Sequence, residues 1–248
     1  MNRSPIPKAL STLFRSEVRA LLMGGQACIL YGAAEFSRDI DLAILTSAEN
    51  LSNLRAVLAE LQAEAAYVPE LTREALLKGH ACHFRCNAPG VEGLRIDVMG
   101  KLRGVADFSA LWERRVEIDL PEVGQVTAMA LEDLVRAKKT QRDKDWPMIR
   151  RLIEADFYRQ GPHAPVDRVK FWLAECRTPE ILQAIAEDSP ELAREMAESR
   201  PLLNSVLSGN LSEITGMLRR EEDRERELDR QYWAPLREEL EAWRRERR

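Results

Sequence analysis

The stretch that most constrains the fold runs from Asp39 to Leu45, with Asp39, Asp41 and Ala43 alternating with Ile40, Leu42 and Ile44. Asp39 and Asp41 fall on one side of this alternation, and aliphatic residues fall on the other. Because successive side chains of a strand point to opposite faces, the pattern predicts a half-buried β-strand. The two carboxylates are therefore expected to project in parallel from one face of a sheet.

The neighbouring segments predict the rest of a small sheet and the helices that cover it. Apolar residues recur at helical spacing over residues 7–19 and 51–61, and residues 82–86 and 94–99 alternate like strands. This order of elements is typical of an α/β (α+β) core, in which helices cover a small mixed sheet. Beyond Thr127 the sequence favours helices, so we predict a core of residues 1–126 and an all-helical C-terminal region of residues 127–248.

Helix starts in the second half are indicated by capping residues. Thr178 and Ser189 each precede a proline, as an N-cap precedes the first helical residue. Ser212 is a further candidate cap. From Arg219 onward acids and bases alternate, which is typical of a solvent-exposed helix.

Charge and hydropathy exclude several classes of protein. The formal net charge of −4 argues against a broadly basic protein that coats nucleic acid. No apolar run approaches the roughly 20 residues that cross a bilayer, and the start of the chain does not resemble a signal peptide. Four cysteines are too few for a disulfide scaffold. We therefore expect a cytoplasmic protein with no membrane partner.

A pair of glycines precedes the two acids. Gly24 and Gly25 let the backbone approach phosphate oxygens closely, because no Cβ intervenes. If a helix begins just after them, the N–H groups of its first turn face the same anion. The pair is therefore a candidate phosphate-binding element.

The aspartates themselves form a candidate metal site. Asp39 and Asp41 would hold their Cβ atoms about 6–7 Å apart, and two such charges are costly without a cation between them. Mg²⁺, or Mn²⁺, favours a few carboxylates together with substrate phosphates. Asp97 is a candidate third ligand, and three carboxylates can hold two ions about 3.5–4 Å apart. The alternative for Asp97 is a simple ion pair with Arg95.

Four residues invite comparison with a zinc site, namely His80, Cys82, His83 and Cys86. Strand alternation places His83 on the face opposite Cys82 and Cys86, so four convergent ligands would require a broken strand. Cysteines that pack as small buried side chains are the better interpretation.

Together these motifs resemble the nucleotidyltransferase superfamily that includes DNA polymerase beta. That family has a Gly-Gly or Gly-Ser pair followed after about a dozen residues by Asp-x-Asp. The sequence is most similar to small bacterial abortive-infection toxin-type nucleotidyltransferases, in Tyr31-Gly32 and in the segment from Ser37 to Leu42. The resemblance makes residues 26–31 a helix, although their apolar run alone would favour a strand, and it makes Ser37 a nucleotide-binding candidate. Ala34-Glu35 departs from the Pro-Arg that the family often has.

A second block extends the resemblance. The run Leu131-Glu132-Asp133-Leu134 leads to Lys138 and then to Arg142-Asp143-Lys144-Asp145. Helical spacing would place Lys138 on one face with Asp133 or Leu134. The resemblance implies that Lys138, Arg142 and Lys144 neutralise a triphosphate. The alternative is that Arg142 and Asp145 form a structural pair that caps the next helix.

The activity that the resemblance implies is transfer of a nucleoside monophosphate from an NTP to a hydroxyl on RNA, protein or a small molecule. Mg²⁺ would be held by Asp39, Asp41 and Asp97. It also implies a toxin–antitoxin or phage-defence role, with a cognate antitoxin or toxin as partner. One alternative is a catalytically inactive, antitoxin-like binding module. Another is an antibiotic nucleotidyltransferase, which needs a strongly acidic wall, for which Glu132 and Asp133 are candidates.

Overall fold

The computed structural model describes residues 4–246 and divides them into two compact units. Unit 1 comprises the described residues before Tyr31, then Ala34–Ala137, and those from Tyr232 onward. Unit 2 comprises Tyr31–Ala33 and Lys138–Gln231. The predicted boundary after residue 126 falls inside unit 1. The mixed sheet and abundant helices confirm the predicted α/β (α+β) class.

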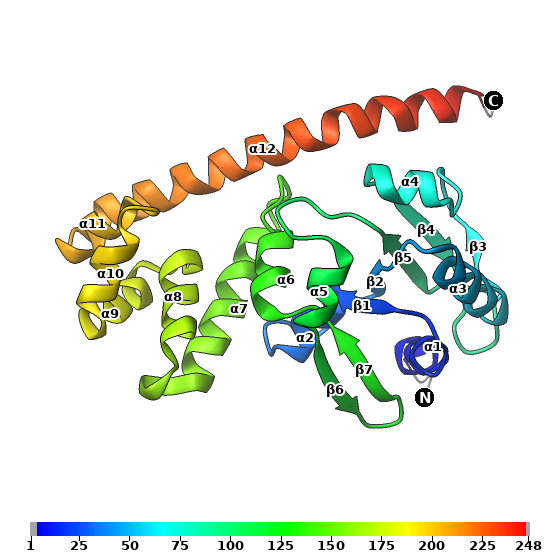
Figure 1. Ribbon diagram of the computed structural model, residues 1–248, viewed down its shortest axis with the longest axis horizontal. Coiled ribbons are helices and arrows are strands. Elements are labelled where there is room, and N and C mark those ends of the chain that lie inside the picture. Colours follow the sequence, from blue (N-terminus) through cyan, green and yellow to red (C-terminus); the bar gives the residue numbers. More distant parts are fainter. Residues whose placement is uncertain (1–3, 247–248) are drawn as a thin grey trace. The chain divides into compact units, whose positions relative to one another are not determined.

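Unit 1 is built on a seven-stranded mixed sheet with the order β3-β4-β5-β2-β1-β7-β6 (Figure 1). Two neighbouring pairs are parallel, β2 with β5 and β1 with β7, and the other pairs are antiparallel. The strands are β1 (Ala20–Met23), β2 (Asp39–Ile44), β3 (Glu64–Ala65), β4 (Ala81–Arg85), β5 (Arg95–Met99), β6 (Val116–Leu120) and β7 (Gly124–Ala128).

The three central predicted strands are confirmed, each within about a residue or two of its expected bounds. Ile40 and Leu42 of β2 lie in the core together with Ile96 and Val98 of β5, and all four are fully buried. Burial of such side chains contributes about 1.5–3 kcal/mol each, so the aliphatic face fixes the register. The acidic residues of β2 and β5 consequently lie on the opposite face.

The helices of unit 1 are short and mostly capped by side chains. Ser47 accepts a hydrogen bond from the Asn50 backbone at the start of the second predicted helix, which is confirmed. The helix expected over residues 7–19 ends at Phe14, because the chain must turn before the strand that begins at Ala20. The helices are α1 (Pro5–Phe14), α2 (Gly24–Leu30), α3 (Ala48–Glu60), α4 (Arg73–Lys78), α5 (Phe108–Glu113) and α6 (Leu131–Ala137). The helix that the family resemblance places at residues 26–31 is confirmed by α2.

The hairpin of β6 and β7 is absent from the sequence-based prediction. Its signal is the alternation of Val116, Ile118 and Leu120, which the many charges of the segment obscure. The turn uses two residues with positive φ, Glu122 at 67° and Gly124 at 95°. Because β7 pairs with β1, the sheet extends beyond the predicted end of the core.

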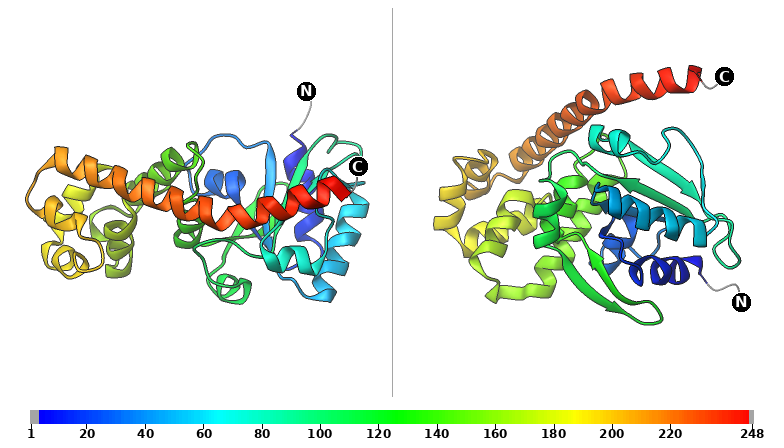
Figure 2. Two further views of the ribbon diagram at one scale, coloured as in Figure 1. Left: turned by 90° about the horizontal axis from the view of Figure 1, so that it is seen from above. Right: turned by 45° about the vertical axis from the view of Figure 1, so that its right-hand side comes forward.

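Unit 2 is helical, as predicted for this part of the chain. Its elements are α7 (Asp145–Gln160), η1 (Gly161–His163), α8 (Val166–Glu175), α9 (Pro179–Asp188), α10 (Pro190–Met196), α11 (Leu202–Leu207) and most of α12 (Leu211–Glu246). Figure 2 shows α9, α10 and α11 packed as a cluster. Helices begin after Thr178 and Ser189 as expected, but neither side chain makes a capping hydrogen bond. The Thr178 hydroxyl donates instead to Glu154.

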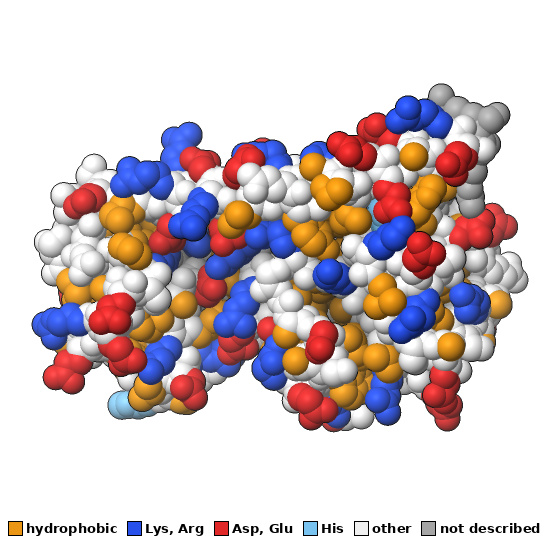
Figure 3. Space-filling model, turned by 45° about the horizontal axis from the view of Figure 1, so that its top comes forward, with side chains coloured by type: hydrophobic (Ala, Val, Ile, Leu, Met, Phe, Trp, Pro, Cys, Tyr) orange, Lys and Arg blue, Asp and Glu red, His pale blue; other side chains and the backbone are white. Residues whose placement is uncertain are grey.

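Helix α12 confirms the predicted charged helix but corrects two details. Asn210 caps it by accepting a hydrogen bond from the Glu213 backbone, so the candidate cap Ser212 is already helical. The helix is also not purely solvent-exposed. Within unit 2 it buries Ile214 and Leu218, and within unit 1 it buries Leu236. On the face drawn in Figure 3, basic and acidic side chains are interspersed.

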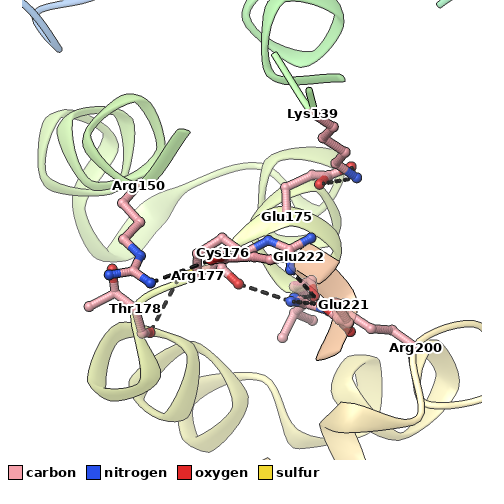
Figure 4. A network of polar contacts seen from close by, with 10 residues as sticks. Lys139, Arg150, Glu175, Cys176, Arg177, Thr178, Arg200, Glu221 and Glu222 are labelled. Atoms are coloured by element: carbon pink, nitrogen blue, oxygen red, sulfur yellow. Dashed lines mark hydrogen bonds and ion pairs between the residues drawn. The ribbon is translucent and has the colours of Figure 1, made fainter. Parts of the chain in front are cut away.

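A buried ionic network joins α12 to its neighbours inside unit 2 (Figure 4). Glu221 lies 2.8 Å from both Arg177 Nη1 and Arg200 Nη2, and both arginines are buried. Burial, together with the nearby charge of Arg200, lowers the pKa of Arg177. Removal of one partner from such a buried set leaves an uncompensated charge, so the network is structural.

None of the described helices is both long enough and apolar enough to cross a membrane.

Candidate functional site

The register of two parallel strands brings the three predicted carboxylates to one face of the sheet. Asp41 of β2 is the register partner of Asp97 of β5, and Asp39 is the partner of Arg95. Partners in register point to the same face, and Asp39 and Asp41 share a face because they are two residues apart. The three acids are therefore neighbours on adjacent strands, opposite the aliphatic core.

Asp97 is held by two basic side chains. Its Oδ1 lies 2.8 Å from His83 Nδ1, and its Oδ2 accepts a hydrogen bond from Arg95 Nη2 at 2.6 Å. Burial alone would raise the pKa of Asp97, but the hydrogen bonds from His83 and Arg95 outweigh it and hold the pKa below its usual value. The ion pair with Arg95, expected as the alternative to metal ligation, is present.

Arg95 also reaches a second acid. Its Nη2 lies 3.9 Å from Asp39 Oδ2, and the Asp39 side chain is 40% exposed. The Nε of Arg95 is buried and has no hydrogen-bond partner among the described residues. Neither Arg95 nor His83 was predicted as a site residue. Strand alternation was the available signal, because it places both on the acidic face of the sheet.

The glycine pair closes the site from the side of α2. Gly24 begins this helix with φ of 63°, and a Cβ on it would overlap the Asp41 carboxylate. A Cβ on Gly25 would overlap the hydroxyl of Ser37. Gln26 donates from Nε2 to the carbonyl oxygen of Ser37, which ties α2 to the segment before β2. Glycine is thus required here so that the backbone can approach Asp41 and Ser37.

The residue types of the site fit a hard divalent cation. Asp39, Asp41 and Asp97 supply carboxylate oxygens, the ligands that Mg²⁺ and Mn²⁺ favour. Within residues 4–246, however, no three acidic, histidine or cysteine side chains converge closely enough to hold an ion as they are placed. Each oxygen of Asp97 already has one basic partner, so an ion shared by all three acids would compete with Arg95 or His83 for this carboxylate.

The basic residues of the second block belong to unit 2 and surround a different acid. Lys138 lies beyond the end of α6, so the expected helical face with Asp133 does not form. Lys138 Nζ lies 3.4 Å from Asp145 Oδ1, and Arg142 Nε lies 2.7 Å from Oδ2. The alternative pairing of Arg142 with Asp145 is therefore observed. Lys144 is exposed and occupies the N-cap position of α7 without a capping hydrogen bond.

Asp133, a candidate for the acidic wall of an antibiotic-binding pocket, does not line such a pocket. Its carboxylate is buried and accepts two hydrogen bonds from Arg114, from Nε at 2.9 Å and from Nη2 at 3.1 Å. A two-armed contact of this kind is a strong structural pair.

The cysteines near the sheet pack in the core. Cys82 and Cys86 are fully buried, and burial raises the pKa of each thiol to about 11. His80 is buried elsewhere in unit 1, with Nε2 2.7 Å from Glu239 Oε2. A cavity of about 340 Å³ lies between α4 and the end of α12, and Lys78 and Trp243 are among its lining residues. It does not include the aspartates of the sheet face.

Comparisons with known proteins give remote structural likenesses only. No protein-family model matches the chain, and no curated protein sequence matches it significantly. Among solved structures, the chain is similar to one described as a "putative nucleotidyltransferase from H. pylori". The TM-score is 0.42 and the identity 15%, over 90% of this chain and 94% of the other. A likeness at this level assigns no activity.

Proposed function

We propose that the chain is a divalent-metal-dependent nucleotidyltransferase that moves a nucleoside monophosphate from an NTP to a hydroxyl group. The observation that carries the proposal is the pairing of Asp41 with Asp97 on adjacent parallel strands, with Asp39 on the same face. Three carboxylates beside a glycine pair form a donor set for a metal–triphosphate complex.

The transfer forms one bond and breaks another. The acceptor oxygen attacks the α-phosphorus of the NTP, the bond from that phosphorus to the bridging oxygen breaks, and pyrophosphate leaves. The acceptor hydroxyl loses its proton to a carboxylate or to water. A divalent ion, when bound, supplies charge neutralisation for the phosphates and the attacking oxygen. Asp39 and Asp41 would bind it, and Asp97 would bind or orient it.

Two further groups position the substrate in this proposal. The backbone at Gly24 and Gly25 would approach the phosphates, and the Ser37 hydroxyl beside Gly25 would donate a hydrogen bond to them. Phosphate binding by Lys138, Arg142 and Lys144 stays a prediction of the resemblance. Lys138 and Arg142 already pair with Asp145, and Lys144 is exposed.

The first acceptors to test are RNA and protein, because the sequence resembles toxin-type enzymes. Purified protein is incubated with each α-labelled NTP, Mg²⁺ or Mn²⁺, and a cell lysate, and labelled RNA is then separated from labelled protein. A labelled small molecule would instead favour a resistance-type enzyme. A toxin–antitoxin role further predicts a partner protein that changes the transfer rate when it is added.

The decisive variant is Asp41→Asn. It keeps the shape of the side chain but removes the charge, and we expect transfer to fall at least about a hundredfold. Asp119→Asn, which removes an exposed acid from β6, is the matched control and should leave transfer unchanged. Equal transfer by Asp41→Asn and Asp119→Asn would exclude the site.

A second candidate, a non-catalytic binding module, is favoured by one observation. The contacts of Asp97 with Arg95 and His83 already neutralise part of the carboxylate cluster without a metal ion. Calorimetric titration with Mg²⁺ and NTP separates the candidates. Metal-dependent NTP binding favours the transferase, and its absence favours the module.

A further inference from the structure

The guanidinium of Arg95 lies among the carboxylates of the sheet face, where the proposed function needs a divalent cation. It donates to Asp97 Oδ2 at 2.6 Å and lies 3.9 Å from Asp39 Oδ2. A guanidinium at these distances attracts both carboxylates. Arg95 therefore already provides part of the charge neutralisation that a metal ion would provide.

The contact of Arg95 with Asp97 uses fewer hydrogen bonds than the contact of Arg114 with Asp133, which also lies in unit 1. Arg114 contacts both oxygens of Asp133 through Nε and Nη2. Arg95 reaches Asp97 through Nη2, while its Nε is buried without a hydrogen-bond partner. A buried donor without a partner carries an unrecovered desolvation cost. The Arg95 contact is thus the more readily exchanged of the two.

The charges of the cluster also favour exchange. Three carboxylates and one guanidinium sum to −3 + 1 = −2, with His83 counted as neutral. A divalent ion is attracted to this surplus, and it competes with the guanidinium for Asp97 Oδ2, the oxygen to which Arg95 donates. The oxygen on the other side of the carboxylate remains with His83.

We propose that Arg95 is a resident counter-ion of the carboxylate cluster, and that a divalent metal ion binds by displacing it from Asp97. Arg95 thereby sets the metal affinity of the site and holds the acids in place before the ion arrives. This inference rests on the proposed function, because it assumes that Asp39, Asp41 and Asp97 take a divalent ion. Arg95 acts through Asp97 and is a positioning residue.

The test is Mn²⁺ binding without NTP, measured as loss of the free-ion electron paramagnetic resonance signal. If Arg95 occupies Asp97 about nine-tenths of the time, Arg95→Gln should bind Mn²⁺ about tenfold more tightly than the unsubstituted chain. Arg85→Gln is the matched control, because Arg85 is the register partner of Arg95 on β4 and is exposed. It removes the same charge nearby and should change the affinity less than about twofold.

Arg95→Lys gives a second measurement, which can be made even if Arg95→Gln does not fold. Lysine keeps the charge but lacks the planar fork of arginine, so its grip on Asp97 is weaker. We expect its Mn²⁺ affinity to lie between those of the unsubstituted chain and Arg95→Gln. An affinity equal to or below that of the unsubstituted chain in both variants would overturn the inference.

Asp41→Asn distinguishes failure of the proposed metal site from failure of the proposed role of Arg95. If it abolishes Mn²⁺ binding while Arg95→Gln behaves like Arg85→Gln, the role of Arg95 is wrong and the proposed function stands. If the unsubstituted chain and Arg95→Gln both fail to bind Mn²⁺, the proposed metal site is wrong and the Arg95 inference falls with it. Tighter binding by Arg95→Gln that Asp41→Asn abolishes supports both.

Discussion

Asp97 in unit 1 and Asp145 in unit 2 are both buried, and each contacts two basic side chains. The net charge of the residues around them nevertheless has opposite sign. Asp97 has Arg95 and His83 as partners, and two more acids share its face of the sheet. Asp145 has Lys138 and Arg142 as partners. The Asp97 cluster therefore has surplus negative charge, and the Asp145 cluster has surplus positive charge.

The difference indicates what each cluster can do. A surplus of carboxylates on a partly exposed face attracts a cation, which is the basis for proposing a metal site there. The negative charge of Asp145 is neutralised by Lys138 and Arg142, and these contacts connect the start of α7 to the loop before it. Its Oδ2 also accepts a hydrogen bond from the Thr140 hydroxyl at 2.5 Å. We therefore expect substitutions at the first cluster to alter ligand binding and those at the second to alter stability.

The largest effect on stability is expected for Asp145→Asn. The substitution leaves Lys138 buried without its acidic partner, and such a loss costs about 3–5 kcal/mol. The free energy of unfolding from urea denaturation measures it. The neighbouring Asp143 pairs with Arg226 but its side chain is 97% exposed, so Asp143→Asn should cost less than about 1 kcal/mol. Similar losses for the two variants would show that the Asp145 cluster is not a structural pair.

The sequence predicts those parts of the fold whose side chains the hydrophobic core constrains most strongly. The strands β2, β4 and β5 were predictable, because one face of each is apolar and the alternation is clear. The β6–β7 hairpin was not, since its residues are largely exposed and the core places little demand on them. The start of α12 was misplaced by two residues because Asn210 and Ser212 are both good caps, and only the folded chain chooses between them.

The candidate site was predictable to a similar extent. The sequence placed Asp39, Asp41 and Asp97 on strands, but the register that pairs Asp41 with Asp97 depends on the order of strands in the sheet. The contact of His83 with Asp97 also depends on that order, because β4 must lie beside β5. Motif spacing also grouped Lys138 with the site, whereas in the fold it pairs with an acid seven residues further on.

The second largest effect on stability is expected at the glycine that contacts the acidic cluster. Gly24→Ala forces a side chain into positive φ, which costs about 1–3 kcal/mol, and its Cβ would also displace the Asp41 carboxylate. Gly93→Ala is the matched control, because Gly93 has φ of 77° and a Cβ added to it would meet no atom within 4 Å. Both variants should lose stability, but only Gly24→Ala should also weaken Mn²⁺ binding. Equal Mn²⁺ affinities would place Asp41 outside the metal site.

The smallest effect is the pH dependence of the Asp145 cluster. Burial opposes ionisation, but the charges of Lys138 and Arg142 hold the pKa of Asp145 in the folded chain below its usual value. The charged form therefore stabilises the fold above the unfolded pKa, and this contribution is lost as the pH falls through the folded pKa. The difference in the free energy of unfolding between the unsubstituted chain and Asp145→Asn should be largest at pH 7. It should decrease as the pH falls below about 4. A difference that stays constant down to about pH 3 would mean that Asp145 stabilises the fold by packing and hydrogen bonding rather than by its charge.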